Sequence, residues 1–101
     1  MPRGGEDVSS ECRVFETDEF ARALARLSAS AAGFIRKKLV SYVYPQLRQE
    51  PYFGPNIKKR QGFSPVVWRY RIGRFRIFYQ VDDAARTVFI LTIDHRKDAY
   101  K

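Results

Sequence analysis

The stretch from Val66 to Val81, which reads VVWRYRIGRFRIFYQV, constrains the fold more than any other part of this sequence. Apolar and basic side chains alternate on both sides of Gly73-Arg74, as in two antiparallel β-strands that are joined by a two-residue loop. Glycine at the first loop position favours a type II′ turn, because glycine tolerates the positive φ required there. Such a turn predicts these facing pairs: Ile72 with Phe75, Arg71 with Arg76, Tyr70 with Ile77, Arg69 with Phe78, and Trp68 with Tyr79.

The predicted hairpin has one apolar face, which belongs in a core, and one face that carries Arg69, Arg71 and Arg76. Like charges that face each other on a sheet destabilise it by roughly 0.2–1 kcal/mol. No Asp or Glu occurs from residue 51 to residue 81. The pattern therefore favours a surface that meets an anion, such as a phosphodiester backbone, over a merely solvated strand surface. Phe78 shares this face, where it could stack on a base or on Arg69.

Length and composition predict one compact domain at residues 11–101, preceded by a flexible extension at residues 1–10. The chain has 101 residues, of which 45% are hydrophobic, so a core can form without disulfides or metals. The single Cys12 suggests a reducing compartment. The polar first ten residues do not resemble a signal peptide, and no apolar run is long enough to cross a membrane. We expect a cytoplasmic protein without membrane contact.

The charge distribution indicates an anionic partner. The formal net charge is +8 and the sequence pI is about 10.0, which suits a nucleic acid, a membrane surface or an acidic protein. The basic residues are concentrated rather than evenly spread. Residues 51–81 contain Lys58, Lys59, Arg60, Arg69, Arg71, Arg74 and Arg76.

The first half of the chain predicts a strand followed by two helices. Residues 11–16 alternate as a short strand. Thr17 or Asp18 can cap the first helix, whose apolar stripe is Phe20, Leu24 and Leu27. Ser28 or Ser30 can cap the second helix, which runs to Leu47. Pro45 removes an amide donor, so we expect this helix to kink or to end near Tyr44 and restart.

The second half predicts three strands. Residues 56–62 form a basic connector into the hairpin, and residues 87–93 are apolar almost throughout, as in a central strand covered on both faces. The predicted order is β-α-α-β-β-β. The fold class is therefore α+β, with a mainly antiparallel four-stranded sheet and a helical hairpin packed on one face.

The residues suited to chemistry are the arginine cluster and the end of the last strand, where His95, Arg96 and Tyr100 follow. RNA cleavage needs a group that removes the 2′-OH proton, a cation that stabilises the phosphorane, and an acid for the 5′-oxygen. Arginine suits the second task, and histidine or a tyrosine with a lowered pKa suits the others. Structural roles for His95 and Tyr100 remain open. One Cys and one His provide no metal-ligand cluster, and no glycine-rich phosphate loop is present.

Three segments together resemble the RelE/ParE superfamily, the toxins of bacterial and archaeal type II toxin–antitoxin pairs. They are PYFGPNIKKRQG, WRYRIGRFRIFYQV and the closing HRKDAY, and the resemblance covers roughly Cys12 to Lys101. It implies a RelE-like fold. The RelE branch consists of ribosome-dependent endoribonucleases that cut messenger RNA in the ribosomal A site. The resemblance also implies a cognate antitoxin as partner, the ribosome and mRNA as targets, and no cofactor.

The resemblance also assigns roles to residues. Arg76 and Arg96 would stabilise the transition state, and Tyr100 and His95 would be the base and acid in an unassigned order. Known members have two lysines on the second strand where this chain has Arg69 and Arg71, which shifts proton transfer toward His95 and Tyr100. The residues expected to bind RNA are Arg69, Arg71, Lys58, Lys59 and Arg74. The alternatives are a ParE-like toxin that poisons DNA gyrase and a non-catalytic RNA-binding module.

Overall fold

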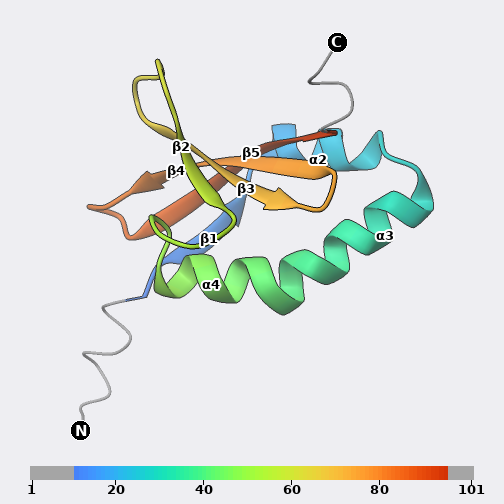
Figure 1. The fold of residues 1–101 in the computed structure, drawn as a ribbon, viewed down its shortest axis with the longest axis horizontal. Helices are drawn as coiled ribbons and strands as arrows, with labels where there is room; N and C mark the ends of the chain where they lie inside the picture. Colours follow the sequence, from blue (N-terminus) through green and yellow to red (C-terminus); the bar gives the residue numbers. More distant parts are fainter. Residues whose placement is uncertain (1–10, 96–101) are drawn as a thin grey trace, which may run out of the picture.

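The computed structural model describes residues 11–95, and the fold is a five-stranded sheet with helices on one side (Figure 1). The sheet order is β1-β5-β4-β3-β2. The strands are β1 (Arg13–Glu16), β2 (Ile57–Arg60), β3 (Val67–Ile72), β4 (Phe75–Asp82) and β5 (Thr87–His95). The helices are α2 (Asp18–Ala25), α3 (Ala29–Lys38), the π-helical turn η1 (Leu39–Val43) and α4 (Tyr44–Gln49). The predicted extension at residues 1–10 and the predicted site residues Arg96 and Tyr100 lie outside the described residues.

The α+β class and the mainly antiparallel sheet are confirmed. The strand pairs β2–β3, β3–β4 and β4–β5 are antiparallel, and β1 pairs with β5 in parallel. The sheet has five strands instead of the predicted four, because the expected connector at residues 56–62 contains β2. This strand is short and three of its four residues are cations, which hides the period of two. Short, charged strands are typical of sheet edges, where they discourage pairing with another chain.

The register predicted for the central hairpin is correct. Arg71 pairs with Arg76, Arg69 with Phe78, and the other predicted pairs are also observed. Gly73 has a φ of 58°, whereas Arg74 is not among the residues with positive φ. This combination fits a type II′ turn and excludes type I′, which needs positive φ at both central positions.

The caps of the first two helices are the predicted hydroxyl side chains. The Thr17 Oγ1 accepts from the Phe20 amide at 3.2 Å and donates to the Ile90 carbonyl at 2.7 Å. It therefore caps α2 and ties the helix to β5. The Ser28 Oγ accepts from the Ala31 amide at 3.2 Å and caps α3.

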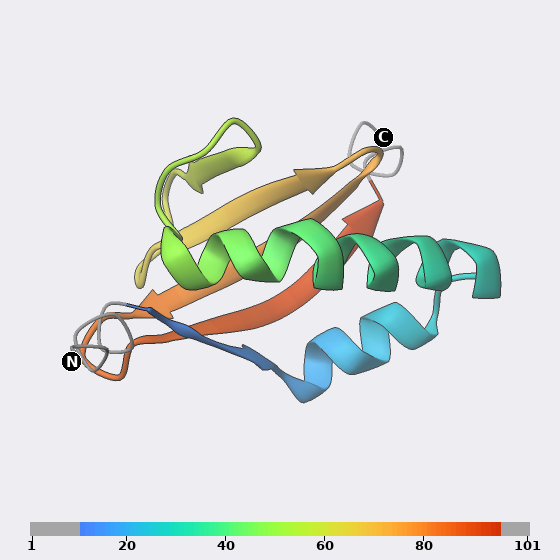
Figure 2. The same ribbon diagram turned by 90° about the horizontal axis from the view of Figure 1, so that it is seen from below.

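We expected the second helix to kink at Pro45, or to end near Tyr44 and restart. An irregularity does lie there, since η1 ends at Val43 and α4 begins at Tyr44, but the helical path from α3 through α4 is not interrupted (Figure 2). The helix instead changes its hydrogen-bonding pattern before the proline. The Tyr44 amide donates to the Leu39 carbonyl, five residues back, and Pro45 stands in the first turn of α4. A π-turn re-routes backbone bonds at the place where proline lacks a donor, so the chain stays helical.

The core lies between the helices and one face of the sheet. Its fully buried members are Phe20, Ile35, Leu39, Val43 and Leu47 from the helices, and Ile77, Tyr79, Val88 and Ile90 from the sheet. The prediction that β5 is covered on both faces is wrong. On the face away from the core, Phe89 and Leu91 are only half-buried. No helix within residues 11–95 is long and apolar enough to span a membrane.

Candidate nucleic-acid interface

Three adjacent strands bring cations to the sheet face opposite the core. Tyr70, Ile72 and Ile77 are buried in the core, so the residues that alternate with them point the other way. Lys58 on β2 lies opposite Arg69 on β3. We call the resulting surface the basic face; its members are Lys58, Arg60, Arg69, Arg71 and Arg76.

Arg76 is a partly buried cation of this face. It stands directly opposite Arg71 in the β3–β4 register. Its Nε is buried and has no hydrogen-bond partner among residues 11–95. A buried donor without an acceptor is costly and uncommon in folded proteins. An anion on the basic face would supply both the acceptor and the charge that this pair lacks.

The sequence argument missed one acidic neighbour of this pair. Asp94 on β5 lies opposite Arg76 on the second side of β4. It is exposed, and no ion pair joins it to Arg76. Asp94 therefore lowers the local positive potential without occupying the guanidinium, because exposed charges interact through high-dielectric solvent.

Two of the cations predicted to bind RNA do not extend from the basic face. Lys59 pairs with Trp68 and so shares the opposite side of the sheet. Arg74 is exposed in the hairpin turn, at the end of the strands. Of the residues Lys58 and Lys59, only Lys58 is placed beside Arg69.

We had expected His95 to lie beside the arginines, but it lies on the other side of the sheet. It pairs with Phe75, and the two rings are 4.7 Å apart at an interplanar angle of 31°. Phe75 belongs to the apolar face of the hairpin, opposite the side that carries Arg76. Proximity of His95 to Arg76 would therefore require its side chain to reach around the end of β5. Arg96 follows directly after this residue in the sequence, outside the described part of the chain.

An arginine–aromatic cluster at the outer end of the basic face had no clear sequence signal. The Arg60 guanidinium carbon lies 4.9 Å from the centroid of the Phe78 ring and 5.0 Å from that of Phe63. Phe78 is only 8% exposed, which leaves little of its ring free for a base, so the expectation that it stacks on a base is wrong. It does lie opposite Arg69 in the β3–β4 register. Phe63 is 47% exposed. The cluster spans β2, β4 and the loop after β2, which no periodicity in the sequence connects.

A groove of about 550 Å³ lies between the long helix and the edge of β3. Its helical side carries Phe34, Lys38 and Tyr42, one turn apart. The Lys38 Nζ lies 4.9 Å from the Tyr42 centroid and 5.8 Å from that of Phe34. Arg71 lines the groove from the sheet. Among the described residues, no acid lines the groove, and its charged side chains, Lys38 and Arg71, are both cationic.

The tyrosines with shifted pKa values belong to the scaffold instead of the basic face. Burial and a hydrogen bond to the Glu16 carboxylate raise the pKa of Tyr44, while Arg36 holds the same carboxylate at 2.6 Å. Burial also raises the pKa of Tyr79, which donates to the Pro51 carbonyl at 2.7 Å. Burial and Asp83 raise the pKa of Tyr52 to about 12. These groups stay protonated and structural near neutral pH.

Among residues 11–95, no three His, Cys, Asp or Glu side chains are grouped so that they could hold a metal ion. The single cysteine of the chain, Cys12, is buried in the core. The basic face itself presents cations, with the rings of Phe78 and Phe63 beside Arg60.

Known proteins with this sequence pattern and fold are toxins. Toxin RelG of Mycobacterium tuberculosis is 32% identical over 63 residues, which cover 62% of this chain and 70% of that protein. The RelBE2 toxin–antitoxin complex of M. tuberculosis contains a chain with a TM-score of 0.67 and 26% identity, covering 85% of this chain and 99% of that one. The fold also matches the archaeal RelE–RelB complex of Pyrococcus horikoshii OT3, with a TM-score of 0.61 and 22% identity, over 85% and 96% of the two chains.

The family comparison covers most of the described domain. The model of the ParE toxin of the type II toxin–antitoxin system parDE matches residues 17–100. The match includes both helices, the hairpin and the closing segment. The chain therefore belongs to the RelE/ParE toxins of type II toxin–antitoxin systems.

Proposed function

We propose that this toxin is a ribosome-dependent mRNA endoribonuclease, which cleaves by attack of a ribose 2′-hydroxyl without a metal ion. The observation that carries the proposal is the convergence of Arg69, Arg71 and Arg76 on one open sheet face. The buried, unpartnered Nε of Arg76 supports it, because a phosphate oxygen is the acceptor that this donor lacks. Action on translating ribosomes would place the protein in the cytoplasm.

In the proposed reaction, a base takes the 2′-OH proton, the 2′-oxygen attacks phosphorus, and the bond to the 5′-oxygen breaks as an acid protonates it. The products carry a 2′,3′-cyclic phosphate and a 5′-hydroxyl. Arg76 and Arg96 would stabilise the phosphorane charge, since positioned donors at developing charge are a large catalytic contribution. Arg69, Arg71 and Lys58 would hold neighbouring phosphates.

Arginine cannot transfer the protons, because it stays protonated in proteins. Tyr100 and His95 are the proposed base and acid. His95 lies beside Phe75, on the opposite side of the hairpin from Arg76. Asp94, one residue before the end of β5, pairs with Arg76.

We also propose a cognate antitoxin as the protein partner. The helical groove offers the exposed rings of Phe34 and Tyr42 beside the cations Lys38 and Arg71. This surface suits an acidic, amphipathic segment that folds as it binds. Because Arg71 belongs both to the groove and to the basic face, an antitoxin in the groove would reach the cation that faces Arg76.

The second candidate function is a ParE-like toxin whose basic face binds DNA gyrase. The match of residues 17–100 to the ParE toxin model favours it. It requires the same cations for protein contact and gives no role to proton transfer by Tyr100. A non-catalytic RNA-binding module would keep the phosphate contacts alone.

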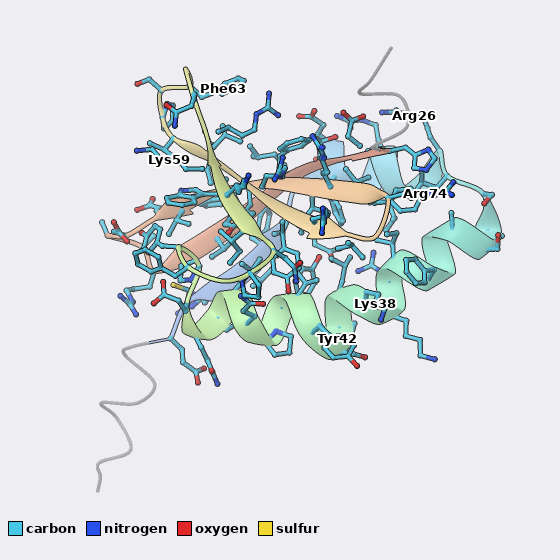
Figure 3. All side chains as sticks on the ribbon, viewed as in Figure 1. Arg26, Lys38, Tyr42, Lys59, Phe63 and Arg74 are labelled. Atoms are coloured by element: carbon cyan, nitrogen blue, oxygen red, sulfur yellow. The ribbon has the colours of Figure 1, made fainter. Side chains whose placement is uncertain are left out.

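Primer extension on mRNA from cells that express the toxin tests these candidates. Wild type, Arg76→Ala and Arg26→Ala are compared; Arg26 is an exposed arginine that directly follows α2 and is not a member of the basic face (Figure 3). The proposal expects new cuts within translated codons for wild type and Arg26→Ala, and none for Arg76→Ala. Intact mRNA with growth arrest and induced DNA-damage signalling would instead identify the gyrase poison.

A further inference from the structure

We infer that Arg60 and Phe63 form a stacking platform for a nucleobase of single-stranded RNA, beside the phosphates held by the basic face. The inference rests on the proposed function and adds a base contact to it. The platform would bind a nucleotide next to the one that carries the scissile phosphate.

The first observation is the layered packing of the cluster. The Arg60 guanidinium carbon lies 4.9 Å from the centroid of Phe78 and 5.0 Å from that of Phe63. A guanidinium plane over an aromatic ring is attracted by the ring quadrupole and also stacks by dispersion. Phe78 is buried in the sheet, so it anchors Arg60, and Arg60 in turn orients Phe63.

The second observation is the exposure of Phe63. Its side chain is 47% exposed on the loop that follows β2, on the side of the sheet away from the long helix (Figure 3). A phenylalanine that is about half exposed beside a cation presents surface on which a base can stack. Such stacking is tolerant of sequence, because every base has an aromatic face.

The third observation is the position of the platform along the strands. Arg60 pairs with Val67, four residues before Arg71 on β3. At about 3.3 Å per strand residue, the backbone of the platform lies about 13 Å from the Arg71–Arg76 pair. Lys58 and Arg69 stand in the row between them. A strand of RNA that crosses the face would therefore meet a phosphate site, then cations, and then an aromatic ring.

The positive charge around the platform suits both RNA and an acidic protein segment, and the Phe63 ring is what favours RNA. No acid occurs from residue 51 to residue 81, which would suit either partner. A flat ring layered on a guanidinium fits a planar base, and alternating phosphates and bases match the cation–aromatic sequence of the face. A protein segment on Phe63 is an outcome that the experiment can identify.

The test measures anisotropy of the full-length toxin with a fluorescent 2′-O-methyl RNA octamer, which cannot undergo 2′-OH attack, and with an octamer of the same length whose bases are absent. Phe63→Ala is expected to weaken binding of the base-containing octamer by roughly 5- to 100-fold, in line with loss of one stacked base. It should leave binding of the abasic octamer unchanged. Phe63→Trp should restore affinity for the base-containing octamer.

Phe53→Ala is the matched control, because Phe53 is 76% exposed on a different loop; it should bind both octamers as wild type does. Thermal melts verify that each variant is folded. Equal weakening for both octamers, or wild-type binding by Phe63→Ala while Arg71→Ala loses affinity, would overturn the platform and leave the proposed cleavage intact. Loss of antitoxin binding alone in Phe63→Ala would overturn it in favour of a protein contact. If no variant binds either octamer, the platform is overturned, and primer extension decides the proposed cleavage separately.

Discussion

Arg71 on β3 and Arg76 on β4 face each other directly across the central hairpin of this toxin. The sequence around this pair serves both the folding of the hairpin and the charge of its outer face. The hairpin needs a tight turn and an apolar inner face, and both are present on either side of the two arginines. The outer face keeps a like-charge contact that destabilises the sheet, which is typical of a site whose natural state includes an anion.

The first prediction concerns the free energy of the like-charge pair. Arg71→Gln should raise the free energy of unfolding by about 0.2–1 kcal/mol at low salt, because it removes the repulsion from Arg76. The gain should shrink near 1 M salt, where the Debye length is about 3 Å. Urea denaturation at two salt concentrations measures both effects. Arg74→Gln, in the turn without a facing cation, is the control; an equal gain in that variant would refute the pairwise origin.

The second prediction contrasts two exposed glycines with open space around them. An added Cβ would meet no atom within 4 Å at Gly33 or Gly73, so only backbone conformation distinguishes the two. Gly33 is inside α3, and Gly33→Ala should stabilise the protein by about 0.5–1 kcal/mol. Gly73 has a φ of 58°, so Gly73→Ala should destabilise it by about 1–2 kcal/mol. Thermal melts that shift both variants in the same direction would contradict this account.

The third prediction is a loss of stability at alkaline pH. The pKa of Tyr44 is raised in the folded state, so above pH 10, its usual value, the folded protein binds more protons than the unfolded chain. The free energy of unfolding should therefore fall as pH rises beyond about 10. Urea melts between pH 8 and pH 11.5 should show a less steep fall for Tyr44→Phe than for wild type. Identical slopes would mean that Tyr44 ionises equally in both states.

The fourth prediction concerns the aromatic and cationic groove. Lys38→Glu should weaken binding of a peptide from the cognate antitoxin at least tenfold, because it places an acid among the groove residues. Lys37→Glu makes the same charge change on the adjacent, exposed residue, which does not line the groove. Isothermal titration calorimetry compares the two variants. Equal weakening would point to long-range charge instead of groove contact.

The central hairpin could be predicted from sequence because its information is local. Alternation assigns a face to each side chain, and Gly73 fixes the turn and thereby the register. The helix caps Thr17 and Ser28 are equally local signals. Alternation and the turn place Arg69, Arg71 and Arg76 on one face of the hairpin, so this central part of the basic face could be predicted.

The errors came from contacts between segments distant in sequence. Strand β2 is recognisable as a strand only through its pairing with β3, since its own residues are mostly cations. Asp94 was missed as a neighbour of Arg76 because β5 brings it there from beyond the acid-free segment. Likewise, the face occupied by His95 depends on its pairing with Phe75. Pro45 predicted the place of the irregularity in the second helix but not its form, which is a π-turn before the proline.

The most direct measurement is single-turnover cleavage of mRNA on purified, programmed ribosomes, with analysis of the product ends. Removing one positioned donor to developing charge typically slows a reaction by about 100- to 1,000-fold. The account therefore predicts 2′,3′-cyclic phosphate ends and a rate for Arg76→Ala reduced by at least about 100-fold, with Arg26→Ala close to wild type. Wild-type cleavage by Arg76→Ala, or no cleavage by the wild-type toxin, would contradict the assignment of the basic face as a catalytic site for RNA.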